Sequence, residues 1–166
     1  MVQDTLSKPK FKMELKKEYG KLREEYNLPS FEDINDEFEI SVIDLEKINS
    51  LPRAILRVMY NKMGIFLQYV EPVINPSPQG LHAFIEVENT TNDEKKEIFT
   101  FYKDLSHKYH KAYALELVED KNAVIKEIKN IWGYWGKVSS DFKKISEIII
   151  KSWEREKEKE KVDTIG

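Results

Sequence analysis

Apolar side chains recur along this chain at the spacing of helical faces, and short breaks separate the segments. Between residues 9 and 26 they return every three or four positions within an otherwise charged segment, which is typical of an amphipathic helix. The same periodicity appears at 30–38, 93–119, 120–136 and 139–153. The pattern predicts an all-α fold, a single-domain bundle of about five to six helices.

Local signals place the ends of these helices. Pro29 ends the first helix because the residue before a proline avoids helical geometry. Ser30 can cap the next helix, and Ser50 followed by Pro52 is a strong helix start. Pro72 is expected to break the chain into a loop through Gly80, and Gly136 is expected to cap the C-terminal end of the helix that begins near residue 120.

Residues 52–71 are predicted to form the central helix of the bundle. Apolar residues cover about two-thirds of its circumference, with Phe66 near the middle of that arc, and such a helix needs neighbours on more than one side. Its polar residues form one strip: Arg57, Asn61, Gly64, Gln68 and Glu71. The strip is either a solvent-facing seam in which Gly64 lets a helix approach closely, or a buried network in which Arg57 needs a carboxylate partner.

Two segments leave more than one interpretation open. Residues 38–43 alternate as a strand would and 81–87 could pair with them, whereas an extended connection or a short helix at 44–48 is the other interpretation. Residues 154–161 alternate glutamate with lysine or arginine and have no apolar face. We therefore expect a helical bundle domain at 1–153 and a charged, flexible C-terminal tail at 154–166.

Composition narrows the class of protein. The chain has 166 residues and no cysteine, which excludes disulfide scaffolds, thiolate metal sites and cysteine nucleophiles. All but four of the 27 basic residues are lysine, and glutamate outnumbers aspartate, a bias found in proteins from high-temperature organisms and also produced by AT-rich coding. The net charge of −3 gives no basic field of the kind that most nucleic-acid-binding domains carry.

No signal-peptide core occurs near the N-terminus, and polar residues interrupt the most apolar stretch, 54–70, so we expect a cytoplasmic protein outside the membrane.

Asp104, His107 and His110 have the only metal-like spacing in the chain. Residues three apart on a helix are neighbours, but His107 lies about 180° from the apolar face of its helix, so this trio is expected to face water. The remaining histidine, His82, has no carboxylate three residues before it. We predict no metal site and no cofactor. Because the chain also lacks a glycine-rich phosphate loop and the local motifs of hydrolases, we name no catalytic residue and do not expect an enzyme.

Several residues are candidates for an interaction surface. Trp132 and Tyr134 lie in an aromatic segment whose third member, Trp135, belongs to the core face, so the first two are free to reach the surface. The full candidate set is Arg57, Asn61, Gln68, Glu71, Trp132 and Tyr134. Basic residues near the N-terminus could contact phosphates, although glutamates interrupt them and a solvated helix surface is the simpler interpretation: Lys8, Lys10, Lys12, Lys16, Lys17, Lys21 and Arg23.

A resemblance to a known family rests on three runs of residues. These are residues 26–34 with 37–40, residues 94–99 with 102–103, and the final Lys151-Ser152-Trp153. Together they resemble a family of small archaeal all-helical proteins that has no assigned function. The resemblance implies an archaeal, cytosolic, helical protein and transfers no residue role.

The sequence favours a non-catalytic module for protein interaction or structural support, such as a subunit of a larger assembly. We expect it to bind a protein partner or to self-associate, and no small-molecule ligand is evident from the sequence. The alternative hypothesis is a nucleic-acid-associated accessory protein that uses the lysine-rich N-terminal helix.

Overall fold

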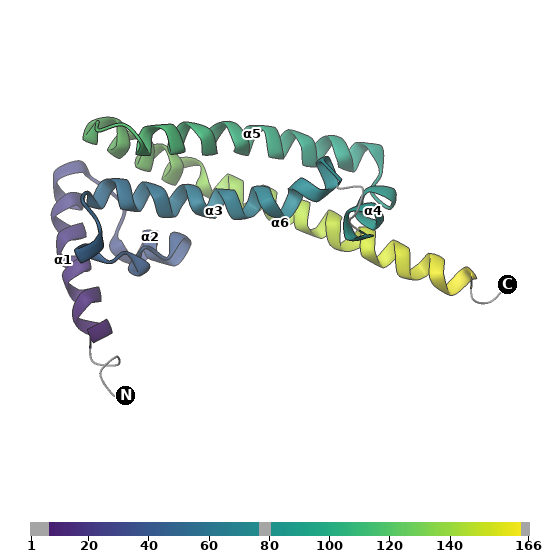
Figure 1. The fold of residues 1–166 in the computed structure, drawn as a ribbon, viewed down its shortest axis with the longest axis horizontal. Coiled ribbons are helices and arrows are strands. Elements are labelled where there is room, and N and C mark those ends of the chain that lie inside the picture. Colours follow the sequence, from purple (N-terminus) through teal and green to yellow (C-terminus); the bar gives the residue numbers. More distant parts are fainter. Residues whose placement is uncertain (1–6, 77–80, 164–166) are drawn as a thin grey trace. The chain divides into compact units, whose positions relative to one another are not determined.

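The computed structural model describes residues 7–76 and 81–163, which form six α-helices and two short 3₁₀ helices (Figure 1). Their bounds are α1 Ser7–Tyr26, α2 Phe31–Phe38, η1 Ile40–Val42, η2 Leu45–Lys47, α3 Leu51–Ile74, α4 Leu81–Glu88, α5 Asn92–Glu116 and α6 Lys121–Asp163. No strand occurs in these residues, so the all-α prediction is confirmed and the two-stranded alternative is wrong. None of the described helices is both long and apolar enough to cross a membrane.

Side chains close to each helix start explain where several helices begin. The Ser30 hydroxyl accepts a hydrogen bond from the Asp33 amide at 3.0 Å, as the sequence predicts. At α5, the Thr91 amide donates to the Glu94 carboxylate at 2.8 Å while the Glu94 amide donates to the Thr91 hydroxyl at 3.3 Å. This reciprocal capping box satisfies two amides that the first turn of a helix leaves without partners.

Two predicted helix ends are wrong. Pro72 lies inside α3, which continues to Ile74 because Val70 and Val73 are buried on either side of the proline. Gly136 lies inside α6, a single helix of 43 residues. An interior glycine costs about 1 kcal/mol relative to alanine, which is less than the gain from burying Trp135 and Val138 beside it.

The contacts divide the chain into two compact units. The first takes in the described residues of Met1–Lys62 and Lys111–Gly133, and the second those of Met63–His110 and Tyr134–Gly166. Helices α3, α5 and α6 each contribute residues to both units.

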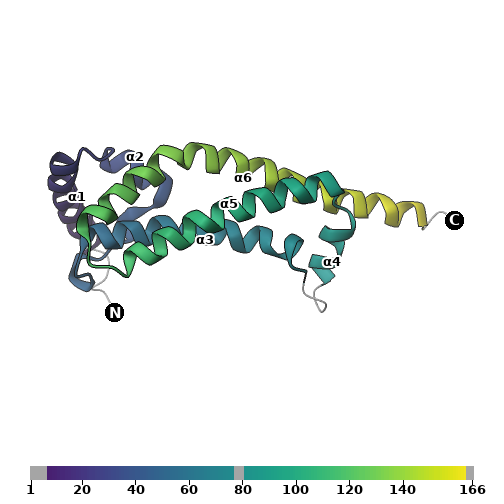
Figure 2. The same ribbon diagram turned by 90° about the horizontal axis from the view of Figure 1, so that it is seen from above.

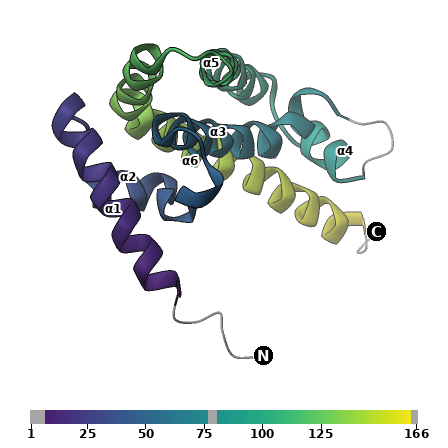
Figure 3. The same cartoon turned by 60° about the vertical axis from the view of Figure 1, so that its left-hand side comes forward.

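In the first unit, α1 packs against α2 (Figure 3). Tyr19 is fully buried, its ring meets Phe31 edge-on at 5.7 Å between centroids, and its hydroxyl donates to the Pro29 carbonyl at 3.0 Å. Burial raises the pKa of Tyr19 well above its ordinary value. Helices α3 and α6 contribute further buried residues to the core of this unit, among them Ile55, Leu56, Met59, Val124, Ile128 and Ile131.

In the second unit, an apolar cluster from α3, α5 and α6 forms the core. Its buried members are Val70, Val73, Ile98, Ile145 and Ile149. Beside it, Phe66 lies face to face with Phe142 at 3.7 Å between centroids and stacks on Trp135 at 5.5 Å. Phe66 is half-buried rather than enclosed, and Ile65 and Tyr69 on the same helix are exposed. Figure 2 shows α4 close to the start of α5.

Helical structure does not stop at the predicted end of the domain. Helix α6 continues to Asp163, ten residues beyond the predicted end of the domain at 153. Arg155 bonds to Glu94 and to the Asn89 carbonyl, and Glu156 accepts a hydrogen bond from Asn89. Packed contacts therefore extend past the predicted boundary. The reason is a long-range charge pair, which the local alternation of charges does not reveal.

Candidate functional site: a groove between α5 and α6

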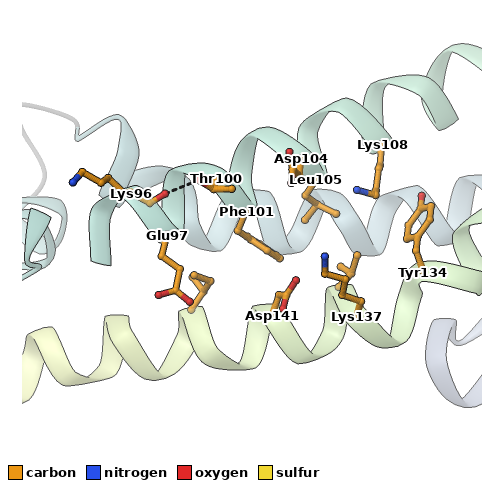
Figure 4. A pocket seen from close by; sticks show the side chains of 12 residues that line it. Lys96, Glu97, Thr100, Phe101, Asp104, Leu105, Lys108, Tyr134, Lys137 and Asp141 are labelled. Carbon is orange, nitrogen blue, oxygen red and sulfur yellow. Dashed lines mark hydrogen bonds between the residues drawn. The ribbon is translucent and has the colours of Figure 1, made fainter. Parts of the chain in front are cut away.

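A groove of about 650 Å³ lies between α5 and α6 in the second unit (Figure 4). Its floor is apolar: Phe101 and Leu105 from α5, and Val138 and Ile145 from α6. Polar and charged side chains surround that floor: Lys96, Glu97, Thr100, Asp104, Lys108, Tyr134, Lys137 and Asp141. The volume falls within the range of about 300–1,000 Å³ that ligand-binding clefts usually have.

Antiparallel packing of two helices brings these residues together. At one end of the shared length, Glu94 of α5 pairs with Arg155 of α6, and at the other end the Lys108 ammonium lies over the Tyr134 ring, 5.2 Å from its centroid. Between these contacts the groove is lined by side chains of both helices, including Ile145 from the core cluster. The site therefore depends on the register between the two helices.

The charges around the groove are separated along its length. In Figure 4, Glu97 lies towards one end, Asp104 and Asp141 near the middle, and Lys137 and Lys108 towards the end marked by Tyr134. Within the part of the chain that the structure describes, these five charged side chains form no ion pair. Their charges are therefore available to a bound molecule. Phe101 is the floor residue that such a molecule would shield further from water, because it is half-buried whereas the other floor residues are already buried.

The polar strip on α3 is exposed at Arg57, Asn61, Gln68 and Glu71. This exposure agrees with the solvent-facing interpretation. Gly64 lies against Tyr109 of α5, because a Cβ atom added there would be 3.3 Å from the Tyr109 Cε2 atom. The strip therefore permits the close approach that the sequence suggested.

Arg57 nevertheless has a carboxylate partner. Its Nη2 atom is 2.5 Å from the Oε1 atom of Glu116, whose side chain is only 5% exposed, and this pairing raises the pKa of Arg57. The Nε atom of Arg53 donates to the Glu116 backbone carbonyl at 2.8 Å. The two arginines of α3 thus hold the C-terminal end of α5, which indicates a structural role for Arg57.

Trp132 and Tyr134 fall in different units. Trp132 is half-buried in the first unit, whereas Tyr134 lines the groove of the second unit beneath Lys108. Of the six residues in the predicted interaction set, Tyr134 alone lines this groove.

Asp104, His107 and His110 are all exposed on α5, as their position on the polar face predicts. Asp104 lies on the groove rim. Among the side chains that the structure describes, no three histidines or carboxylates converge in a way that could hold a metal ion. The side chain of His82 lies outside the described part of the molecule.

Among the N-terminal basic residues, Lys12, Lys16, Lys17, Lys21 and Arg23 are exposed, and the side chains of Lys8 and Lys10 are outside the described part. Carboxylates are mixed with them. Lys16 forms an ion pair with Glu32, and Lys21 forms one with Glu18 at 2.6 Å. The helix surface therefore carries both signs of charge.

Sequence reasoning missed most of the groove. It identified Tyr134 as a surface candidate and Asp104 as part of a metal-like trio, but it assigned no role to Lys108, Lys137 or Asp141. The usable signal was the presence of Phe101 beside the main apolar row of its helix. An apolar side chain outside the core row marks a helix with a second contact surface.

Comparisons of this chain with protein-family models, with curated proteins and with solved structures gave no match. The archaeal family resemblance therefore remains an expectation.

Proposed function

We propose that this protein is a non-catalytic protein-interaction module whose binding surface is the groove between α5 and α6. The observation that carries the proposal is the combination of an apolar floor with five charged side chains that no other described residue neutralises. Apolar surface framed by charged residues is the usual composition of a protein-binding site.

The length of the groove favours a polypeptide over a small molecule. From Glu97 to Lys108 the groove follows three turns of α5, which is a length of about 16 Å at 1.5 Å per residue. Only two helices form its walls, whereas a small-molecule site usually encloses most of its ligand. A segment of another protein can follow such a surface and pair with charges along it. A role as a subunit of a larger assembly is part of the same proposal.

A photo-crosslinking amino acid at Thr100 tests the proposal in the full chain. Thr100 lines the groove and its side chain is exposed. The matched control is Lys103, exposed on the same helix but outside the groove. Crosslinking in cells of the source organism should yield a defined protein adduct from position 100 and not from position 103. Identical adducts from both positions, or none from position 100, would contradict the proposed function.

The alternative, association with nucleic acid, has weaker support. Lys16 and Lys21 pair with carboxylates, so part of the N-terminal basic surface is already neutralised. Binding to mixed-sequence DNA and RNA over a salt series tests it, because affinity that depends on phosphate contacts falls steeply as salt rises. An archaeal source, growth at high temperature and a cytoplasmic location belong to the proposal as well, supported by the composition and the resemblance described above.

A further inference from the structure

The groove carries the side-chain spacing of a helix-binding seam. On α5 the lining residues Glu97, Phe101, Asp104 and Lys108 follow one another at intervals of four, three and four. On α6 the residues Tyr134, Val138, Asp141 and Ile145 repeat the same intervals. This is the spacing of the contact positions in coiled coils, where a row of this kind receives the side chains of an adjacent helix.

Both rows face the same groove, so the surface has places for side chains on both of its walls. A third helix laid along it would contact α5 and α6 together, as helices do in bundles. An extended strand would instead seek a row of backbone hydrogen-bonding groups, and two α-helices offer none along their sides. The spacing therefore favours a helical occupant of about three turns.

The distribution of charge gives that occupant a direction. Glu97, Asp104 and Asp141 occupy one part of the groove, and Lys137 and Lys108 occupy the other (Figure 4). Lys96 lies near the acidic end, but Asp93 pairs with it at 3.1 Å. A helix has a partial positive charge at its N-terminus and a partial negative charge at its C-terminus. The N-terminus of the bound helix is therefore favoured beside the carboxylates of the groove, and the C-terminus of the bound helix is favoured beside the lysines.

We infer that the groove binds a single amphipathic helix of a partner protein, parallel to α5, with basic residues in its first half and acidic residues in its second half. This inference rests on the proposed function and adds the form, charge pattern and direction of the partner. An apolar stripe on that helix would cover Phe101, the half-buried member of the groove floor.

Two synthetic helical peptides of 14 residues, with the same composition and the same apolar stripe, test the inference. The forward peptide has lysines in its first half and glutamates in its second half, and the reversed peptide has the opposite order. Fluorescence anisotropy with the full-length protein at low salt should show tighter binding of the forward peptide by about tenfold. The preference should shrink as salt rises, because exposed charges are screened.

A second experiment reverses charged residues of the groove in the protein itself. In the Lys108→Glu/Lys137→Glu variant the forward preference should disappear or invert, and circular dichroism melting would establish that the variant is folded. Because Lys108 contacts Tyr134, the single variant Lys137→Glu gives an independent measurement, with a smaller shift in the same direction. The matched control is Lys103→Glu, which changes the same net charge outside the groove and should leave the preference intact.

The outcomes separate this inference from the proposed function. Equal affinities for the two peptides, or no binding of either, would overturn the inference, and crosslinking from Thr100 would still decide the proposed function. If the protein self-associates in sedimentation experiments and Thr100→Arg abolishes that self-association, a second copy of the chain occupies the groove and the inference is overturned. The inference is also overturned if a small apolar dye binds saturably and neither peptide displaces it.

Discussion

Arg155 and Glu94 form a two-point ion pair across 61 residues of chain. The Nη1 atom of Arg155 lies 2.9 Å from the Oε2 atom of Glu94, and its Nη2 atom lies 2.7 Å from Oε1. The same Nη1 atom donates to the Asn89 carbonyl at 2.5 Å. Since Glu94 also caps the start of α5, one guanidinium joins α6 to the turn from which α5 begins.

Arg155→Ala should lower the free energy of unfolding by about 2 kcal/mol, because it removes charge-assisted hydrogen bonds from partly buried acceptors. Arg155→Lys should recover only part of the loss, since an ammonium cannot form the two-point contact. Urea unfolding measures both. Lys157→Ala, at an exposed position on the same helix, should change stability by less than about 0.5 kcal/mol. Equal effects of Arg155→Ala and Lys157→Ala would mean that the ion pair does not stabilise the fold.

Stability should depend on pH through Glu94. Hydrogen bonds from Arg155 lower the pKa of Glu94 from 4.5 to about 2. A carboxyl group with a depressed pKa in the folded state stabilises the fold above its unfolded pKa and loses that effect as pH falls through its folded pKa. The advantage of the wild type over Glu94→Gln should therefore be largest above pH 4.5 and vanish towards pH 2. Urea unfolding at several pH values tests this, and a constant difference across that range would contradict it.

Gly136→Ala should stabilise the protein by about 0.5–1 kcal/mol. The residue lies inside α6, and a Cβ atom added there meets nothing within 4 Å. Alanine removes the conformational freedom that glycine has in the unfolded chain. Thermal melting should show a rise of about 1–4 °C for a protein of this size. Gly64→Ala provides the contrast, since its Cβ would press on Tyr109 at 3.3 Å. An equal gain at both positions would show that packing at Gly64 is looser than described.

Phe66→Ala should cost about 3 kcal/mol, near the lower end for loss of a core aromatic ring, because Phe66 stacks on Phe142 and Trp135 but is only half-buried. Phe99→Ala makes the same chemical change at a position that is 52% exposed, and should cost less than about 0.5 kcal/mol. Denaturant unfolding of the two variants compares them directly. If Phe66→Ala were as mild as Phe99→Ala, the aromatic stack would not contribute to the core.

Arg57→Met should destabilise the first unit by about 1–3 kcal/mol, because it leaves the buried Glu116 carboxylate without its ion-pair partner. Adding Glu116→Gln should recover part of this loss by removing the buried charge. Asn61→Ala, one turn along the same exposed strip, should be nearly neutral. A double variant no more stable than Arg57→Met alone would exclude the unpaired charge as the cause.

Sequence predicted the fold well where local chemistry decides it. Pro29 and Ser30 separate α1 from α2 at the expected place, and Phe31, Ile34 and Phe38 form the buried face that their spacing indicates. It failed at Pro72 and Gly136, because a local helix-breaking tendency of a few kcal/mol competes with burial contributed by distant segments. The buried side chains that favour continuation, Val73 and Val138, meet partners that local periodicity cannot identify.

The candidate site was less predictable than the fold. Lys137 and Asp141 have the composition of any exposed helix face, and their significance depends on which turn of α5 lies opposite. That register depends on contacts such as Lys108 over Tyr134 and Arg155 with Glu94, between residues far apart in the chain. A single sequence records the spacing within each helix but not the alignment between helices.

The boundaries between the two units fall at 62/63, 110/111 and 133/134, each inside a helix. Each unit is therefore encoded by two separate stretches of the gene, and the stretches alternate. A fragment that ends at residue 133 contains the whole first unit only together with residues 63–110 of the second, and a fragment that begins at residue 63 contains the whole second unit only together with residues 111–133 of the first. A substitution that weakens α3, α5 or α6 near these boundaries would affect both units at once.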